Sequence, residues 1–396
     1  MKPSVAVPSR STRRYQHGDN ATPGSGQRLT VGVVEQQKVI VITGANGGIG
    51  AAAARELARQ GHRLALVGLE RADTERIAAE LGATAYTADF SSFAQVRELG
   101  RRLLADLPRI DVLVNNAGMM SGTRHAVTED GNEWTLQVNH LAPFLLTQLL
   151  APRLAEWDGR VVVTASLMSS SRLARFDPER LSNGRRYRAL DAYAASKLAN
   201  IAFAAEMPAR IGAVRAVSFH PGIVRTNFGA EGPMFVRTFM RSPFRAFLRS
   251  PEQAADTLVW LATVDGTRLI DGAYYFDRRP ARPNPLVYDA RFRRTLWRRT
   301  SELVNAPGLH APMVEAAPAN TTQLNAVPVN AMPAAASLTD AARLEATRLE
   351  ATRLEAVRVD AARLEAARLE AVCAALAAVR QRAGEPASLT AGALRG

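Results

Sequence analysis

A tyrosine and a lysine in the middle of the chain have the spacing and the chemistry of a proton-transfer pair. Tyr193 and Lys197 are four residues apart at the start of a predicted helix, in the sequence YAASK. This spacing places both side chains on one face of the helix. A nearby ammonium group favours the phenolate, so we expect the pKa of Tyr193 to lie below the ordinary tyrosine value of about 10. Tyr193 is then suited to exchange a proton with the oxygen of a substrate.

A serine hydroxyl is the expected third member of this site. Ser166 lies just beyond a predicted strand at 160–164, where its hydroxyl can bond both a substrate oxygen and Tyr193. Reduction of a carbonyl or oxidation of an alcohol needs a proton donor or acceptor at the oxygen and a nicotinamide near the carbon. The spacing of Tyr193 and Lys197 alone would be weak evidence for this chemistry, because helices carry such pairs by chance.

A glycine-rich turn provides a place for a nicotinamide nucleotide. The predicted strand 38–43 leads directly into TGANGGIG at 43–50 and then into an alanine-rich helix. Gly44 permits a tight turn, Gly48 lets the backbone approach a pyrophosphate, and Gly50 lets the helix pack closely on the strand. The amides at the helix N-terminus point at the phosphates. A plain turn between a strand and a helix needs one glycine, whereas this turn has four.

The Gly-x-x-x-Gly-x-Gly spacing after a threonine resembles the short-chain dehydrogenase/reductase superfamily, and the resemblance extends over residues 38–304. It adds Asn139 to the three residues above and so completes a catalytic tetrad in the family's order. It implies that Asn139 holds a water that passes protons to Lys197, and that Lys197 also binds the nicotinamide ribose. The alternative function is a non-catalytic NAD(P)-binding regulator or scaffold. Such a protein is expected to have lost Tyr193 or Lys197, and this chain has both.

The same resemblance assigns further cofactor contacts. It implies that Asp89 contacts the adenine amino group and that the Asn-Asn-Ala-Gly run at 115–118 steadies the sheet and lines the cofactor. It also implies that the Pro-Gly backbone at 221–222 meets the nicotinamide carboxamide, while Thr226 bonds the carboxamide or the phosphates. For Asp89 alone, capping of the next helix is the simpler interpretation. The complete predicted cofactor set is Gly44, Asn46, Gly48, Ile49, Gly50, Arg71, Asp89, Phe90, Asn116, Ala117, Gly118, Tyr193, Lys197, Pro221, Gly222, Val224 and Thr226.

The choice between NAD and NADP depends on the end of the second predicted strand, 63–67. NAD sites usually place an acidic residue there to bind the ribose hydroxyls, but that position falls near Gly68. Glu70 could reach the ribose, or Arg71 could meet a 2′-phosphate. The missing acid favours NADP over NAD.

A parallel sheet is needed to bring these residues together. Short β-branched runs alternate with helical stretches between residues 36 and 304, a pattern typical of parallel strands with crossover helices. The predicted fold class is α/β, a single doubly wound Rossmann domain with a seven-stranded parallel sheet. The predicted strands are 38–43, 63–67, 84–88, 112–115, 160–164, 214–219 and 273–276, and the predicted helices include 51–60, 91–107, 133–155 and 192–211.

The two ends of the chain differ in composition from its centre. Residues 1–35 are predicted to be a disordered arm, 36–304 the catalytic domain and 305–338 an Ala/Pro-rich linker. Residues 339–396 carry a five-residue Arg-Leu-Glu-Ala repeat, which favours a low-complexity helix over a β-helix because so few repeats cannot bury a core. The arm lacks the apolar segment of a secretory signal and Cys373 is the single cysteine, so we expect a cytoplasmic location.

Three segments concern the substrate. The stretches 139–147 and 173–188 are most similar to the retinol-dehydrogenase-like branch of the superfamily, whose members act on lipophilic alcohols, aldehydes and ketones. The segment 235–248 is rich in aromatic residues and arginine. It could form a lid over such a substrate, an ordinary amphipathic helix, or an interfacial element on an anionic membrane. The predicted substrate is therefore a small lipophilic carbonyl or alcohol.

Other partners are less well indicated. The net charge of +13 admits an anionic partner, but the basic cluster at 291–299 belongs to no recognised nucleic-acid-binding module. We expect instead a C-terminal helix whose aromatic side chains pack on the sheet, and no nucleic-acid partner. No metal site is expected, because His140 and His220 flank matched motifs and no cluster has metal-ligand spacing. Nothing in the sequence indicates the oligomeric state.

Overall fold

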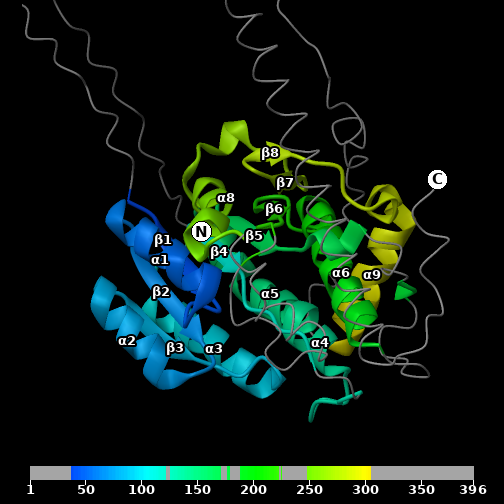
Figure 1. The fold of residues 1–396 in the computed structure, drawn as a ribbon, viewed down its shortest axis with the longest axis horizontal. Helices are drawn as coiled ribbons and strands as arrows, with labels where there is room; N and C mark the ends of the chain where they lie inside the picture. The colour runs from blue at the N-terminus through cyan, green and yellow to red at the C-terminus, as the bar shows by residue number, and fades with distance from the viewer. Residues whose placement is uncertain are drawn as a thin grey trace, which may run out of the picture. The chain divides into compact units, whose positions relative to one another are not determined.

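An eight-stranded sheet forms the centre of the folded unit (Figure 1). The computed structural model describes residues 37–121, 125–170, 176–178, 188–222, 224 and 248–304. Within them the strand order is β3-β2-β1-β4-β5-β6-β7-β8, and every neighbouring pair is parallel except β7 and β8. The strands are β1 (Val39–Thr43), β2 (Arg63–Gly68), β3 (Thr84–Thr87), β4 (Val112–Asn115), β5 (Arg160–Thr164), β6 (Arg215–Phe219), β7 (Tyr274–Phe276) and β8 (Arg279–Pro280). The predicted doubly wound Rossmann fold is confirmed.

The prediction of seven parallel strands was incomplete by one edge strand. All seven are present with ends within one residue of those predicted, and β8 adds an antiparallel pair with β7. The two strands are joined by Asp277 and Arg278, which both have positive φ, 46° and 61°. Such a two-residue turn is usually signalled by Asn-Gly or Asp-Gly, and neither is present here. A strand of two residues also has no apolar alternation to detect.

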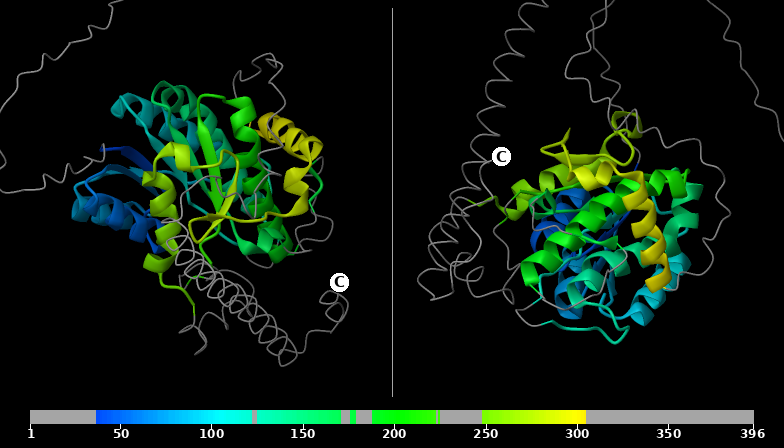
Figure 2. Two further views of the ribbon diagram at one scale, coloured as in Figure 1. Left: turned by 90° about the horizontal axis from the view of Figure 1, so that it is seen from above. Right: turned by 90° about the vertical axis from the view of Figure 1, so that its right-hand side faces the viewer.

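Helices cover both faces of the sheet, as Figure 2 shows from two further directions. On one face α1, α2 and α8 pack against strand side chains such as Ile40 and Ile42. On the other face α3, α5, α6 and α9 surround side chains such as Val41 and Val163. Neighbouring residues of one strand thus serve opposite layers. The helices are α1 (Gly48–Arg59), α2 (Arg71–Leu81), α3 (Phe93–Asp106), α4 (Trp134–Leu136), α5 (Ala142–Glu156), α6 (Ala189–Arg210), α8 (Pro251–Thr263) and α9 (Ala290–Leu303).

The predicted helix 133–155 is interrupted by a π-helical turn at Gln137–Leu141, between α4 and α5. In this turn a backbone N–H donates to the carbonyl five residues earlier instead of four. Pro143 has no N–H to offer the carbonyl of Asn139, four residues before it, which disfavours a regular α-helical turn at this point. The wider turn directs two consecutive side chains, Asn139 and His140, into hydrogen bonds with α6.

The C-terminal helix α9 packs mainly on other helices. The ring of Trp297 lies 4.9 Å from that of Phe144 on α5 and 5.7 Å from that of Phe203 on α6, measured between centroids. Phe292 of the same helix lies in one hydrophobic cluster with Tyr274 of β7. The aromatic residues of α9 thus reach the core both through helices and beside an edge strand.

Several predicted features lie outside the described residues. They are the N-terminal arm, the linker, the repeat tail, Thr226 and most of the segments 173–188 and 235–248. Among the helices that the structure does describe, none is long and apolar enough to cross a membrane. The same residues contain no group of three or more His, Cys, Asp or Glu side chains arranged to hold a metal ion.

Candidate active site

The predicted site residues gather at the carboxyl edge of the sheet. The strand order changes direction between β1 and β4, with β2 and β3 following on one side and β5 and β6 on the other. In open parallel sheets, ligands bind at such a switch point, beyond the carboxyl ends of the strands. The predicted motifs follow β1, β4, β5 and β6, so the topology brings them to one place.

The glycine turn after β1 lies tightly against the loop after β4. Gly44 and Gly48 have positive φ of 67° and 52°, in the region that favours glycine. A Cβ on Gly44 would lie 2.8 Å from Cα of Ala117. A Cβ on Gly50 would overlap the carbonyl oxygen of Gly44 and lie 2.8 Å from Nδ2 of Asn116. The glycines at 44 and 50 are therefore required by close packing of backbone on backbone.

The N-terminus of α1 fits a pyrophosphate. Its N-cap residue is Gly47, so no side chain at this position accepts from the first amides of the helix. These amides also have no partner within the helix. The helix dipole favours negative charge at this end. A Cβ on Gly47 would meet nothing within 4 Å, so there is open space beside the turn. Asn46 and Ile49, also predicted to contact the cofactor, are only partly buried here.

The loop after β4 is hydrogen-bonded to the strands on both sides of it. Thr43 Oγ1 accepts from the amides of Asn116 and Ala117, both at 3.0 Å. The side-chain nitrogen of Asn116 donates to the carbonyl of Thr43 at 3.0 Å, and its oxygen accepts from Thr164 Oγ1 at 3.2 Å. These bonds join the ends of β1, β4 and β5. Asn116 was predicted from its motif, whereas the two threonine hydroxyls were not, since their partners come from other strands.

The end of β2 explains why the acidic residue typical of NAD sites is missing. A Cβ on Gly68 would overlap the hydroxyl of Thr74. Thr74 is fully buried, and its hydroxyl donates to a backbone carbonyl at 2.7 Å. A carboxylate side chain therefore does not fit at position 68. Arg71, at the start of α2, is largely exposed and pairs with Glu75 at 2.8 Å.

Asp89 and Phe90, which follow β3, are placed differently from each other. One carboxylate oxygen of Asp89 accepts from the amide of Ser91 at 2.8 Å, a local turn contact. The N-cap residue of α3 is Ser92, so the capping interpretation of Asp89 was wrong. The side chain of Phe90 is buried in the hydrophobic core. A contact of Phe90 with a cofactor would therefore have to come from its backbone.

Tyr193 is buried near the start of α6 and hydrogen-bonds with Ser166. Burial raises the pKa of Tyr193 to about 12, and the bond with Ser166 opposes this rise. The expected lowering of the pKa of Tyr193 was therefore wrong. Lys197 Nζ is 5.9 Å from the centroid of the tyrosine ring, and at this distance the loss of hydration outweighs its influence. Tyr193 carries its proton at neutral pH.

Lys197 is held by a backbone carbonyl at the end of β5 and lies close to the loop after β4. Its Nζ donates to the carbonyl of Thr164 at 3.1 Å. A Cβ on Gly118 would lie 3.1 Å from Nζ of Lys197 and 3.3 Å from Oδ1 of Asn139, so the glycine allows all three residues to lie close together. Burial lowers the pKa of Lys197 to about 8, which leaves it mostly charged at neutral pH.

Asn139 joins the loop after β4 to α6. Its Oδ1 accepts from the amide of Met119 at 2.7 Å, and its Nδ2 donates to the carbonyl of Met119 at 2.8 Å and to Oγ of Ser196 at 3.0 Å. Ser196 Oγ in turn donates to the carbonyl of Tyr193 at 2.8 Å. Both side-chain atoms of Asn139 are thus bonded to protein groups. The sequence did not indicate a role for Ser196 or Met119. Ser196 lies between the two motif residues Tyr193 and Lys197 without being one of them, and Met119 bonds Asn139 through its backbone, which every residue type has.

The loop after β6 completes the described part of the site. Burial lowers the pKa of His220 to about 4, so its neutral Nδ1 accepts from the amide of Gly222 at 3.0 Å. Gly222 has a φ of 83°, and the nearby Val224 forms a parallel bridge with Arg249. These contacts fix the Pro-Gly backbone beside the ends of β5 and β6. His220 supports the loop, as expected.

Together, the strand order, the glycine turn and the helix N-terminus at the switch point define a Rossmann-type nucleotide-binding domain. Residues 38–178 match the family described as short chain dehydrogenase. A Streptomyces protein with the provisional name daunorubicin C-13 ketoreductase DnrU is 45% identical over 67% of this chain and 92% of its own. Human retinol dehydrogenase 13 is 34% identical over 67% of this chain and 84% of its own. The crystal structure of an uncharacterised protein from Mycobacterium paratuberculosis has a TM-score of 0.55 and 30% identity, over 68% of this chain and 94% of that one.

The chain belongs to the short-chain dehydrogenase/reductase family, in its retinol-dehydrogenase-like branch. It is an NAD(P)-dependent oxidoreductase that acts on the CH–OH or C=O group of a small molecule. The alternative of a non-catalytic regulator has no support among these relatives.

Proposed function

We propose that the protein is an NADPH-dependent reductase of lipophilic ketones or aldehydes, with Tyr193 as the proton donor. The observation that carries this proposal is the buried arrangement of Tyr193, which hydrogen-bonds with Ser166 and has Lys197 Nζ 5.9 Å from its ring centroid. Burial raises the pKa of Tyr193 to about 12 and lowers the pKa of Lys197 to about 8. At neutral pH Tyr193 therefore has a proton to give, and Lys197 has a charge to stabilise the phenolate. The 45% identity with a relative named as a ketoreductase supports the same direction.

Each part of the cofactor has residues that suit it. The turn residues Gly44, Asn46, Gly48, Ile49 and Gly50 would hold the pyrophosphate, Asp89 and Phe90 the adenine, Arg71 the 2′-phosphate, Lys197 and Tyr193 the nicotinamide ribose, and Asn116, Ala117, Gly118, Pro221, Gly222, Val224 and Thr226 the nicotinamide side. When bound, the nicotinamide supplies the hydride.

The proton follows a separate route through the protein. Tyr193 Oη donates its proton to the substrate oxygen, and the hydroxyl of Ser166 hydrogen-bonds the same oxygen. The ammonium of Lys197 favours the phenolate that remains and then passes a proton back to it. The predicted relay water would bind to the backbone carbonyl of Asn139. The side chain of Asn139 is not the proposed binding group, because its atoms are bonded to Met119 and Ser196.

A small panel of carbonyl compounds tests this function. With NADPH, we expect the full-length chain to reduce daunorubicin at its C-13 ketone and all-trans-retinal at its aldehyde, the two lipophilic probes that the names of its relatives suggest. Pyruvate, a small polar ketone, serves as the control and should react at least about tenfold more slowly, because a lipophilic site leaves its charge unpaired. Loss of NADPH absorbance gives the rates. Equal rates with pyruvate, or turnover of alcohols alone, would contradict the proposal.

Substitution of Arg71 tests the preference for NADPH. Arg71→Ala should raise the Kd of NADPH by roughly ten- to a hundredfold, the range for a lost hydrogen bond to a charged group, and should change the Kd of NADH by less than about twofold. Arg76→Ala is the matched control, because Arg76 is also an exposed arginine of α2, paired with Asp73 at 3.2 Å. Fluorescence titration measures both constants. An equal loss of both nucleotides in Arg71→Ala would remove the phosphate contact from the proposal.

A further inference from the structure

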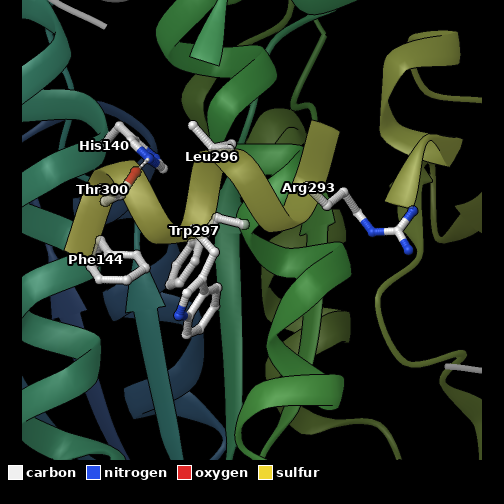
Figure 3. A pocket seen from close by; sticks show the side chains of 7 residues that line it. His140, Phe144, Arg293, Leu296, Trp297 and Thr300 are labelled. Carbon is white, nitrogen blue, oxygen red and sulfur yellow. Dashed lines mark hydrogen bonds between the residues drawn. The ribbon is translucent and has the colours of Figure 1, made fainter. Parts of the chain in front are cut away.

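A line of buried hydrogen bonds leads from α9 to the lysine of the active site. His140 is 1% exposed, and its Nε2 lies 3.0 Å from Oγ1 of Thr300 on α9. Figure 3 shows these two side chains pointing at each other. On its other side, Nδ1 of His140 lies 3.2 Å from Oδ1 of Asn200 on α6. Nδ2 of Asn200 donates to the carbonyl of Thr164 at 3.4 Å, and that carbonyl also accepts from Nζ of Lys197 at 3.1 Å.

The donors and acceptors fix the direction of this line. Because the amide nitrogen of Asn200 donates to Thr164, its oxygen is the atom that faces His140. Nδ1 of His140 must therefore carry a proton and donate it. Burial lowers the pKa of His140 to about 4, so the ring is neutral at pH 7 and Nε2 is an acceptor. The hydroxyl of Thr300 must then donate to Nε2, since no other orientation satisfies every buried group.

The surroundings of His140 protect the line from water. Phe144, Phe203, Leu296 and Trp297 line the same space, and Figure 3 shows Phe144 and Trp297 beside the bonded pair. Arg293 also lines this space, but its guanidinium points away from His140 in Figure 3 and bonds Glu206 and the carbonyl of Val287. The aromatic and aliphatic side chains offer no group that could replace a lost bond. The packing of Trp297 between α5 and α6 also sets the position of Thr300, one turn further along α9.

We propose that Thr300, His140 and Asn200 are positioning residues that hold Lys197 in place for proton transfer, acting through the shared carbonyl of Thr164. The inference rests on the role proposed above for Lys197. As long as Asn200 donates to the carbonyl of Thr164, that carbonyl is shared and does not bind Lys197 alone. The remaining N–H groups of Lys197 then stay directed towards Tyr193 and the nucleotide.

Loss of the Thr300 hydroxyl should change the pKa of Lys197 in one direction. Without the hydroxyl, the ring of His140 loses the bond at Nε2 and is held at Nδ1 alone. The ring and the amide of Asn200 can then turn away from the carbonyl of Thr164. The carbonyl of Thr164 then bonds Lys197 more strongly, which favours the ammonium and raises its pKa above about 8. The same change draws Nζ away from Tyr193.

Among the described residues, few other groups can influence this titration. The neighbours of Nζ are Tyr193 on its own helix, the carbonyl of Thr164 at the end of β5, Gly118 after β4, and the amide of Asn139 in the π-helical turn. Tyr193 is the titratable neighbour, and burial is the cause of the shift in the pKa of Lys197. A change in the alkaline limb of the pH profile therefore reports on Lys197.

Three variants of the full-length chain test the proposal. Thr300→Val removes the hydroxyl and keeps the side-chain shape, and Thr300→Ser restores a hydroxyl. Thr263→Val is the matched control: Thr263 Oγ1 donates to the carbonyl of Val259 at 2.9 Å within α8, which packs on the opposite face of the sheet. For each, kcat and KM for daunorubicin or all-trans-retinal with NADPH are measured between about pH 6 and 10, a range chosen to span the ordinary titration of lysine and its shifted value.

We expect Thr300→Val to lower kcat at pH 7 by roughly two- to tenfold, the effect of one net hydrogen bond, with little change in KM. Its alkaline limb should move to higher pH by about half a unit, a fold-change of about three in the ionisation constant. Thr300→Ser should return both quantities towards the wild type. Thr263→Val also loses a hydroxyl hydrogen bond and should keep the wild-type limb. Coincidence of the limbs of Thr300→Val and Thr263→Val would overturn the proposal.

A binding measurement separates this proposal from the proposed function. The Kd of NADPH, followed by fluorescence over the same pH range, depends on the charge of Lys197 and needs no turnover. If the wild type reduces neither probe, the proposed function fails, but the midpoint of the binding profile should still lie at higher pH in Thr300→Val. An unchanged midpoint in that variant overturns the positioning role, whether or not the wild type turns over.

Discussion

Replacement of Tyr193 by phenylalanine should lower kcat/KM for carbonyl reduction by about 10²–10⁴-fold, the usual contribution of a positioned general acid. Phenylalanine keeps the ring in its buried place at the start of α6 and removes only the hydroxyl that hydrogen-bonds with Ser166. The Kd of NADPH should change much less than the turnover, because the glycine turn is untouched. Steady-state rates and fluorescence titration on the same preparation give both values.

Tyr275→Phe is the matched control for this substitution. Tyr275 lies on β7 and is also buried. Its hydroxyl accepts from the amide of Ile270 at 2.9 Å and, among the residues that the structure describes, makes no hydrogen bond with the tetrad. Its loss should lower the free energy of unfolding by about 1 kcal/mol and leave kcat/KM near the wild-type value. A Tyr193→Phe variant that keeps more than about a tenth of the wild-type rate would contradict the prediction, because a positioned general acid contributes more than about tenfold. The proton would then have to come from another group.

A methyl group on Gly50 should abolish tight cofactor binding. In Gly50→Ala the new Cβ would overlap the carbonyl oxygen of Gly44 and approach Nδ2 of Asn116 to 2.8 Å. Neither neighbour can give way cheaply, because one is backbone and the other bonds the carbonyl of Thr43. The turn and the N-terminus of α1 must shift, which we expect to cost about 1–3 kcal/mol of stability and to raise the Kd of NADPH by about a hundredfold or more.

Gly47→Ala is the control for the stability part of this prediction. A Cβ on Gly47 would meet nothing within 4 Å, and its backbone is extended, with a φ of 179°. Its melting temperature should equal or exceed that of the wild type, because alanine restricts the unfolded chain. Thermal unfolding without added nucleotide compares the two variants. Equal melting temperatures would show that the turn accommodates a side chain at position 50.

The features that the sequence predicted correctly are those set by local spacing. The strands β4 and β5 are short apolar runs between turn residues, and their ends match the predictions. The glycine turn and the four-residue step from Tyr193 to Lys197 are also local patterns with one geometric meaning. Such patterns determine which residues stand at the edge of the sheet.

The features that were missed depend on burial or on partners distant in the chain. Whether the pKa of Tyr193 falls or rises depends on how far the surrounding helices remove water, and no spacing encodes that. The carbonyl of Thr164 holds Lys197 through a backbone atom that every residue type has. The steric reason for Gly68 lies in Thr74, which reaches it only after α2 has packed.

The π-helical turn at Gln137–Leu141 has a consequence for how this gene can change. Asn139 bonds Ser196, and His140 bonds Asn200, one turn further along α6. Both residues lie within the wide π-helical turn, and both reach α6 from it. Deletion of a single codon here would restore an ordinary helix and rotate the preceding residues by about 100° relative to α5. Evolution can therefore substitute residues in this segment, but we expect it to keep the segment's length.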